Sequence, residues 1–120
     1  MAASLYERLG GSEGITQIAS DALDNHLANE RIKARYESLD NLEAVRQGAA
    51  DFFISATGGP DVYSGKNMLE THKGMNIDEA EFMAVVDDIL DSLDKNSIAQ
   101  REQEEVLFAL YSMRKEIVKV

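Results

Sequence analysis

The chain of 120 residues contains no cysteine and one proline, Pro60. The absence of cysteine excludes a disulfide framework, thiolate ligation of zinc or an iron–sulfur cluster, and a cysteine nucleophile. Strand-rich folds need many turn residues, so a single proline favours helices. No run of about 18 apolar residues occurs, and the start of the chain is too short and too polar for a signal peptide. These absences predict a cytoplasmic protein without a membrane segment.

Basic residues are also scarce: 12 Lys and Arg stand against 22 Asp and Glu, which gives a net charge of −10. This balance argues against nucleic acid or an anionic membrane as a partner, because both require cationic side chains. The hydrophobic fraction of 44% is ordinary for a globular protein. The length predicts a single domain over residues 1–120.

Hydrophobic residues recur at helical spacing along most of the chain. Four such stretches cover 12–27, 42–56, 78–93 and 98–117, with Ser12 as a candidate N-cap of the first. We find no alternating strand pattern and no internal repeat. The sequence therefore predicts an all-α fold with four substantial helices.

Residues 60–77 interrupt this pattern, because they contain few apolar anchors. One interpretation is a long surface loop; loops of this length are usually functional or disordered. The other interpretation is a short helix that a ligand beside it holds in place, since helices below about 12 residues are marginal on their own.

Residues that carry chemistry are few, and the histidines are only His26 and His72. No nucleotide-binding glycine loop, hydrolase elbow or zinc motif is present, so a hydrolase or nucleotide enzyme is not expected. Acidic stretches such as Asp87-Asp88 and 102–105 are predicted to be solvated surface. A single histidine after apolar residues suits an axial haem ligand, although a half-buried surface histidine gives the same pattern.

Three motifs in order carry a resemblance to a known family. Residues 5–11 read LYERLGG, residues 52–66 begin FF and continue through GGP to YSGK, and residues 68–77 read MLETHKGMNI. They resemble the opening, the second diglycine with its loop, and the proximal-histidine segment of the truncated (two-over-two) haemoglobins, most closely their first group. The resemblance covers nearly the whole chain.

The resemblance implies a two-over-two helical sandwich that binds haem b (iron protoporphyrin IX), with His72 as the proximal iron ligand. Phe52 matches the aromatic residue that shields the haem on the distal side, and Lys66 falls near a haem propionate. For the apolar positions, plain core packing is the alternative to haem contact. These further positions are Phe53, Met68, Leu69, Ile77, Phe82 and Val85.

The distal side departs from the family pattern. Leu23 stands where the family usually has a tyrosine, and Val45 and Ala49 stand where a hydrogen-bonding residue is frequent. Tyr36 matches the aromatic wedge of the haem, and its hydroxyl either replaces the missing donor or points to solvent. His26 lies on the apolar stripe of the first helix, either as a core histidine with a partner or as a group reaching the sixth iron position.

The resemblance implies a haem protein that binds O2, CO or NO, with storage, transport, sensing and NO chemistry all open. The apolar residues of the distal side imply weaker O2 retention than in relatives with distal tyrosine and glutamine. Turnover as an NO dioxygenase would need an external reductase. The alternative is a globin-fold module that has lost haem and serves in interaction or regulation.

Overall fold

The computed structural model describes residues 3–120, and the chain folds into helices joined by short loops. The helices are α1 (Leu5–Arg8), α2 (Gly11–Ala28), α3 (Lys33–Glu37), α4 (Leu42–Ala56), α5 (Met68–His72), α6 (Glu79–Lys95), α7 (Gln100–Ser112) and α8 (Arg114–Ile117). Within the described residues the only β pairing is one isolated parallel bridge between Ile77 and Val118.

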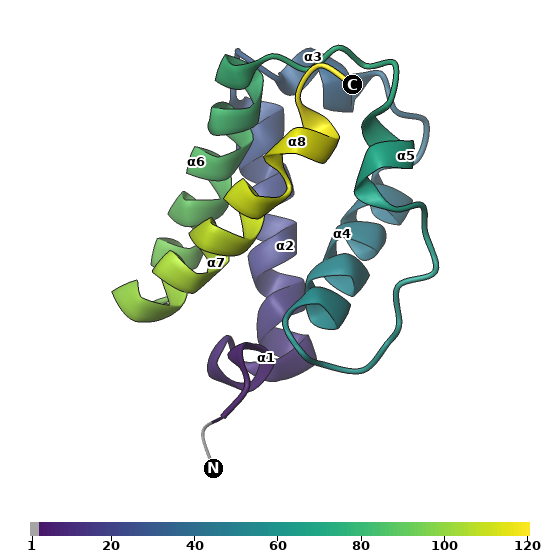
Figure 1. Cartoon of the computed structure of the whole chain (residues 1–120). Coiled ribbons are helices and arrows are strands. Elements are labelled where there is room, and N and C mark those ends of the chain that lie inside the picture. The colour runs from purple at the N-terminus through teal and green to yellow at the C-terminus, as the bar shows by residue number, and fades with distance from the viewer. Residues whose placement is uncertain (1–2) are drawn as a thin grey trace.

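The body of the molecule is formed by the long helices α2 and α4 and the long helices α6 and α7 (Figure 1). α2 packs against both α4 and α6, and α6 packs against α7. This arrangement confirms the predicted all-α, two-over-two sandwich. No helix within residues 3–120 is both long and apolar enough to cross a membrane.

Local sequence signals set the start of three helices through capping boxes, in which a polar side chain accepts from a backbone N–H three residues later. The pairs are Ser4 with Glu7, Asn67 with Glu70, and Asp78 with Glu81. The predicted start at residue 78 is therefore confirmed, with Asp78 as the N-cap of α6.

The prediction that Ser12 caps the first long helix is wrong. The N-cap lies two residues earlier, at Gly10 with a φ of 100°, and α2 begins at Gly11. That left-handed conformation favours glycine and places Ser12 inside the helix. Its hydroxyl lies 2.8 Å from the Tyr6 hydroxyl instead, so it ties α2 to α1.

Two other elements differ from the sequence prediction. The last helix is not continuous, because α7 ends at Ser112 and α8 starts after Met113. The five residues of α3 carry no periodic signal, since the segment is barely longer than one turn. Both features shape the wall of the cavity described below.

Buried polar contacts join α2 to α6. The Ser92 hydroxyl is fully buried and donates to the backbone carbonyl of Ile18 over 2.7 Å. The Asn96 amide donates to Asp21 over 3.0 Å. Because buried polar groups are costly without partners, these contacts fix the register between the two helices.

The segment that contains α5 is held by the C-terminal residues. The backbone N–H of Gly74 donates to the carbonyl of Val120 over 3.0 Å, and the N–H of Lys119 donates to Ile77 over 2.8 Å. α5 also packs against α8. Contacts with the C-terminal residues therefore secure the segment that follows a helix too short to be stable alone.

We expect Gly59→Ala to destabilise the protein, because an added Cβ would lie 2.6 Å from Cε1 of the Tyr6 ring and 2.8 Å from the Ile54 carbonyl oxygen. Crowding of this kind costs about 1–3 kcal/mol of unfolding free energy, measurable by urea denaturation. Ser64→Ala, at an exposed position of the following loop, is the control and should change that free energy by less than about 0.5 kcal/mol. Equal stability of both variants would contradict the close approach of Gly59 to Tyr6 and Ile54.

Candidate functional site

The site is centred on His72, the last residue of α5. Its Nδ1 lies 2.8 Å from the backbone carbonyl of Met68, one turn earlier. A carbonyl only accepts, so Nδ1 carries the hydrogen and Nε2 keeps its lone pair. This is the tautomer of a histidine that binds a metal through Nε2, with the second nitrogen fixing the orientation of the ring.

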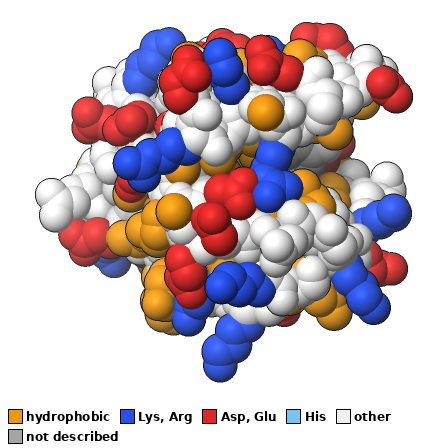
Figure 2. Space-filling model, turned by 90° about the horizontal axis from the view of Figure 1, so that it is seen from above, with side chains coloured by type: hydrophobic (Ala, Val, Ile, Leu, Met, Phe, Trp, Pro, Cys, Tyr) orange, Lys and Arg blue, Asp and Glu red, His pale blue; other side chains and the backbone are white. Residues whose placement is uncertain are grey.

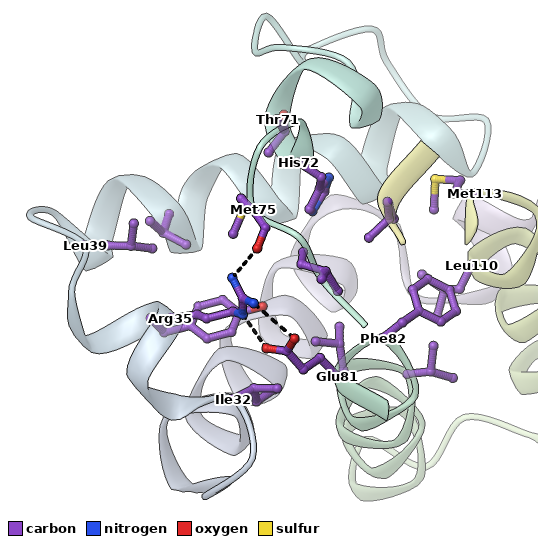
Figure 3. A pocket seen from close by; sticks show the side chains of 16 residues that line it. Ile32, Arg35, Leu39, Thr71, His72, Met75, Glu81, Phe82, Leu110 and Met113 are labelled. Atoms are coloured by element: carbon purple, nitrogen blue, oxygen red, sulfur yellow. Dashed lines mark hydrogen bonds and ion pairs between the residues drawn. The ribbon is translucent and has the colours of Figure 1, made fainter. Parts of the chain in front are cut away.

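Two cavities of about 450 and about 390 Å³ adjoin at His72. In the larger one the His72 ring points inward from α5, facing side chains of α3, α6 and α7 (Figure 3). The walls of both cavities are mostly apolar. The residues common to both linings are Tyr36, Val45, Thr71, His72, Val85, Leu110, Met113 and Ile117.

The structure brings most of the predicted site residues to these cavities. Those in one lining or both are Leu23, Tyr36, Val45, Ala49, Phe52, Phe53, Met68, His72, Ile77, Phe82 and Val85. Lys66 and Leu69 are exposed and belong to neither lining, and the Leu69 side chain is 45% exposed. Their contact with a cofactor stays a prediction.

Tyr36 from α3 lies in the lining of both cavities. Burial raises the pKa of Tyr36 to about 12, and the negative charge of Asp88 acts in the same direction. The phenol is therefore protonated at neutral pH and can donate a hydrogen bond. Leu23, Val45 and Ala49 line one or both cavities and offer no polar side-chain atom. Their place on the distal side of a haem stays a prediction.

An ion pair that sequence reasoning missed stands beside the larger cavity. The Arg35 guanidinium donates to the Glu81 carboxylate, with Nη2 3.0 Å from Oε1, and to the backbone carbonyl of Met75 over 3.1 Å (Figure 3). The guanidinium lowers the pKa of Glu81. No motif links residues 46 positions apart, so only the tertiary structure reveals the pair.

The end of the molecule that carries α3 and the C-terminus is shown in Figure 2. Acidic and basic side chains are interspersed there with hydrophobic ones, and a hollow opens on this face.

Tyr63 lines the smaller cavity and is another residue that sequence reasoning missed. Its ring stands edge-on to Phe52, with centroids 5.3 Å apart. The YSGK motif was its only signal in the sequence.

The prediction that Asp88 is solvated surface is wrong. Its side chain is buried on α6, and its Oδ2 lies 2.8 Å from Nδ1 of His26 on α2. His26 also stacks on Tyr36, with ring centroids 4.9 Å apart. Of the two interpretations of His26, the structure supplies what the core histidine requires, a hydrogen-bonding partner that offsets its burial.

The free Nε2 of His72 and the mostly apolar walls of the two cavities together fit a flat apolar group with one axial ligand. Among residues 3–120 no group of three or more His, Cys, Asp or Glu side chains could hold a bare metal ion. The oriented imidazole of His72 among mostly apolar walls instead matches the needs of haem, whose iron requires a single proximal histidine in globins.

Comparison with known proteins identifies the family. The family model described as "Bacterial-like globin" matches residues 4–119. A group 1 truncated haemoglobin from Tetrahymena pyriformis is 30% identical over 115 residues, which cover 96% of this chain and 94% of that protein. The chain belongs to the truncated haemoglobin family. A group 1 truncated haemoglobin from Mycolicibacterium paratuberculosis is 28% identical over 96% of this globin and 84% of that protein.

Solved structures agree with this membership. The truncated haemoglobin of Tetrahymena pyriformis in its Fe(III) form superposes with a TM-score of 0.94 at 28% identity, over 98% of this chain and 100% of that chain. A group II truncated haemoglobin from Bacillus anthracis shares the fold, with a TM-score of 0.88 at 17% identity over 98% of this chain and 92% of that chain. The predicted resemblance is confirmed, and the globin family implies haem binding.

We expect acid to destabilise this globin through His26. Burial lowers the pKa of His26 below its usual 6.5, so the unfolded state takes up a proton first as the pH falls. The contribution of His26 to stability is complete above about pH 6.5 and is lost as the pH falls through the lower folded-state pKa.

Urea denaturation of the haem-loaded protein at about pH 7.5 and about pH 5.5 measures this loss, and His26→Gln should flatten the pH dependence. An equally steep dependence in His26→Gln would show that another group is responsible.

Proposed function

We propose that this chain binds haem b through Nε2 of His72 and takes up O2, CO or NO at the sixth iron position. The observation that carries the proposal is the hydrogen bond from His72 Nδ1 to the Met68 carbonyl, which leaves Nε2 free where two apolar cavities meet. A ferrous haem bound there supplies one open coordination position for a diatomic gas.

Relatives support the choice of cofactor. The Tetrahymena pyriformis haemoglobin was solved as an Fe(III) form, and a two-over-two haemoglobin from Synechococcus in a cyanomet state with covalently attached haem. The covalent attachment concerns that second protein, whose identity to this chain is 24%. Family membership and the Fe(III) form together favour an iron porphyrin over other flat cofactors.

Different residues of this chain would contact the apolar faces of the haem and its propionates. Val85 and Phe82 on α6 and Phe52 on α4 would contact its apolar faces and exclude water. Lys66 is exposed, so its ammonium group is free to approach a propionate from outside the cavity.

The gas would meet one donor. Leu23, Val45 and Ala49 are apolar, so the Tyr36 hydroxyl is the group that we assign to hydrogen-bond bound O2. A single phenol gives weaker O2 retention than a tyrosine with glutamine. We propose storage, transport or sensing of gas in the cytoplasm, and NO dioxygenation only where an external reductase supplies electrons.

Absorption spectra of the ferric, ferrous and CO-bound forms test the proposal. The wild-type protein should show a Soret band that shifts with each state. Absence of haem after reconstitution with hemin would reject it and favour the haem-free interaction module.

His72→Ala should abolish stable haem retention, because it removes the proposed iron ligand, and added imidazole should restore a ligated spectrum. Lys73→Ala, at the next and exposed position, is the matched control and should retain haem. The same absorption titration with hemin serves for both variants. Wild-type haem affinity in His72→Ala would refute the assignment of the proximal ligand.

Tyr36→Phe should speed O2 dissociation, because a hydrogen bond to a strongly polar bound gas contributes about 1.5–3 kcal/mol, which corresponds to roughly a ten- to hundredfold change in rate. CO dissociation should change little, since bound CO is less polar. Leu23→Tyr should slow O2 dissociation by adding a donor. Flash photolysis and stopped-flow mixing give these rates, and an unchanged O2 off-rate in Tyr36→Phe would mean that the distal wall is entirely apolar.

A further inference from the structure

The second histidine of the chain repeats the geometry of the first. The His26 side chain belongs to the lining of the smaller cavity, as does that of His72. Its Nδ1 lies 2.8 Å from Oδ2 of Asp88, whereas His72 uses a backbone carbonyl at the same distance. In both rings Nδ1 therefore forms a hydrogen bond with an oxygen atom.

Asp88 is fixed as the acceptor in this contact. The Asn29 amide donates to both of its carboxylate oxygens, over 3.2 and 3.1 Å, and the residue is only 7% exposed. Both carboxylate oxygens accept from Asn29, and Asp88 is the acceptor in its contact with His26 as well. The hydrogen of the neutral imidazole is then on Nδ1, and the lone pair is on Nε2.

His26 is neutral at physiological pH and its ring is held in place. Burial lowers the pKa of His26, and Asp88 opposes the shift only in part. The residue is 7% exposed, and within residues 3–120 only Nδ1 has a hydrogen-bond partner. Stacking on Tyr36 fixes the plane of the ring at 19° to the phenol.

A neutral imidazole oriented by a carboxylate, with Nε2 unpartnered at a cavity, is the arrangement of a general base. Tyr36 is the matching donor in the same cavity. O2 and CO carry no proton and need only the donor. A base becomes useful for molecules that must lose a proton before they bind.

We propose that His26, oriented by Asp88, accepts the proton of small weak acids HX, such as hydrogen cyanide or hydrogen sulfide, that bind the haem iron as anions. The H–X bond breaks, the proton goes to Nε2 of His26, and X keeps the electron pair, with which the anion would bind a ferric haem iron. Nothing is oxidised or reduced. The Asp88 carboxylate stabilises the imidazolium that forms. The inference rests on the proposed haem site.

The test compares cyanide association with the ferric protein and CO association with the ferrous protein, both near neutral pH by stopped-flow mixing. His26→Leu should slow cyanide association by about a hundredfold or more, the usual contribution of a general base. CO association should stay unchanged, because CO has no proton to lose. Asp88→Asn should slow cyanide association to an intermediate degree.

Asp21→Asn is the matched control. Asp21 is also 7% exposed and also receives an asparagine amide, from Asn96, but it touches neither His26 nor a cavity. Asparagine at position 21 keeps a side-chain oxygen that can accept from the Asn96 amide, so the contact between α2 and α6 is preserved and both rates should stay unchanged. An effect of Asp21→Asn as large as that of Asp88→Asn would overturn the proposal in favour of a general loss of stability.

Three further results would overturn the inference. The first is an unchanged cyanide rate in His26→Leu, and the second is an equal slowing of CO. The third is a change of the ferrous spectrum from six- to five-coordinate in that variant, which would show that Nε2 binds the metal. Failure of the wild type to bind haem would instead reject the proposed function.

A measurement that needs no variant and no cyanide keeps the proposal testable if His26→Leu does not fold. ¹⁵N NMR of the CO-bound protein, which is diamagnetic, should show His26 as the neutral tautomer with hydrogen on Nδ1 at neutral pH. A hydrogen on Nε2 in the neutral ring would overturn the assignment, because that nitrogen could not then accept a proton.

Discussion

The polar contacts between α2 and α6 are the constraint on which the site depends. The buried hydroxyl of Ser92 binds the Ile18 carbonyl, and one turn earlier on α6 the Asp88 carboxylate binds His26. Apolar packing alone tolerates small shifts between helices, whereas a buried hydrogen bond is lost when its partners slide apart. Both helices contribute walls to the smaller cavity, so fixing their register also fixes its shape.

The two histidines that line the smaller cavity are oriented by different kinds of partner. His72 is oriented by a carbonyl four residues earlier in its own helix, which requires only local structure. His26 is oriented by a carboxylate 62 positions away, which requires the folded protein. The Asp88 carboxylate can stabilise a positive charge on His26, although burial still lowers the pKa of that ring. This contact suits a proton acceptor, whereas the carbonyl contact of His72 fixes only the orientation of its ring.

The proximal segment is held more firmly than its composition suggests. One interpretation of residues 60–77 was a short helix held in place by a ligand. The capping box at Asn67 and the backbone contacts of Gly74 and Ile77 with the C-terminal residues already restrain the part of this segment from residue 67 onward. Such restraint would keep the His72 ring in position before a ligand arrives. Preorganisation of this kind reduces the ordering cost of binding.

The sequence alone determined the helical fold and three of the long helices within a residue or two, because helical periodicity and capping are local signals. The ordered motifs singled out His72, whose role as iron ligand stays a prediction. It also marked the apolar distal positions Leu23, Val45 and Ala49, whose contact with haem stays a prediction. Only the tertiary structure decided that Asp88 is buried against His26 and that Arg35 pairs with Glu81. A polar residue on a helix looks the same in the sequence whether water or another helix faces it, and only the packing of α2 on α6 makes that choice.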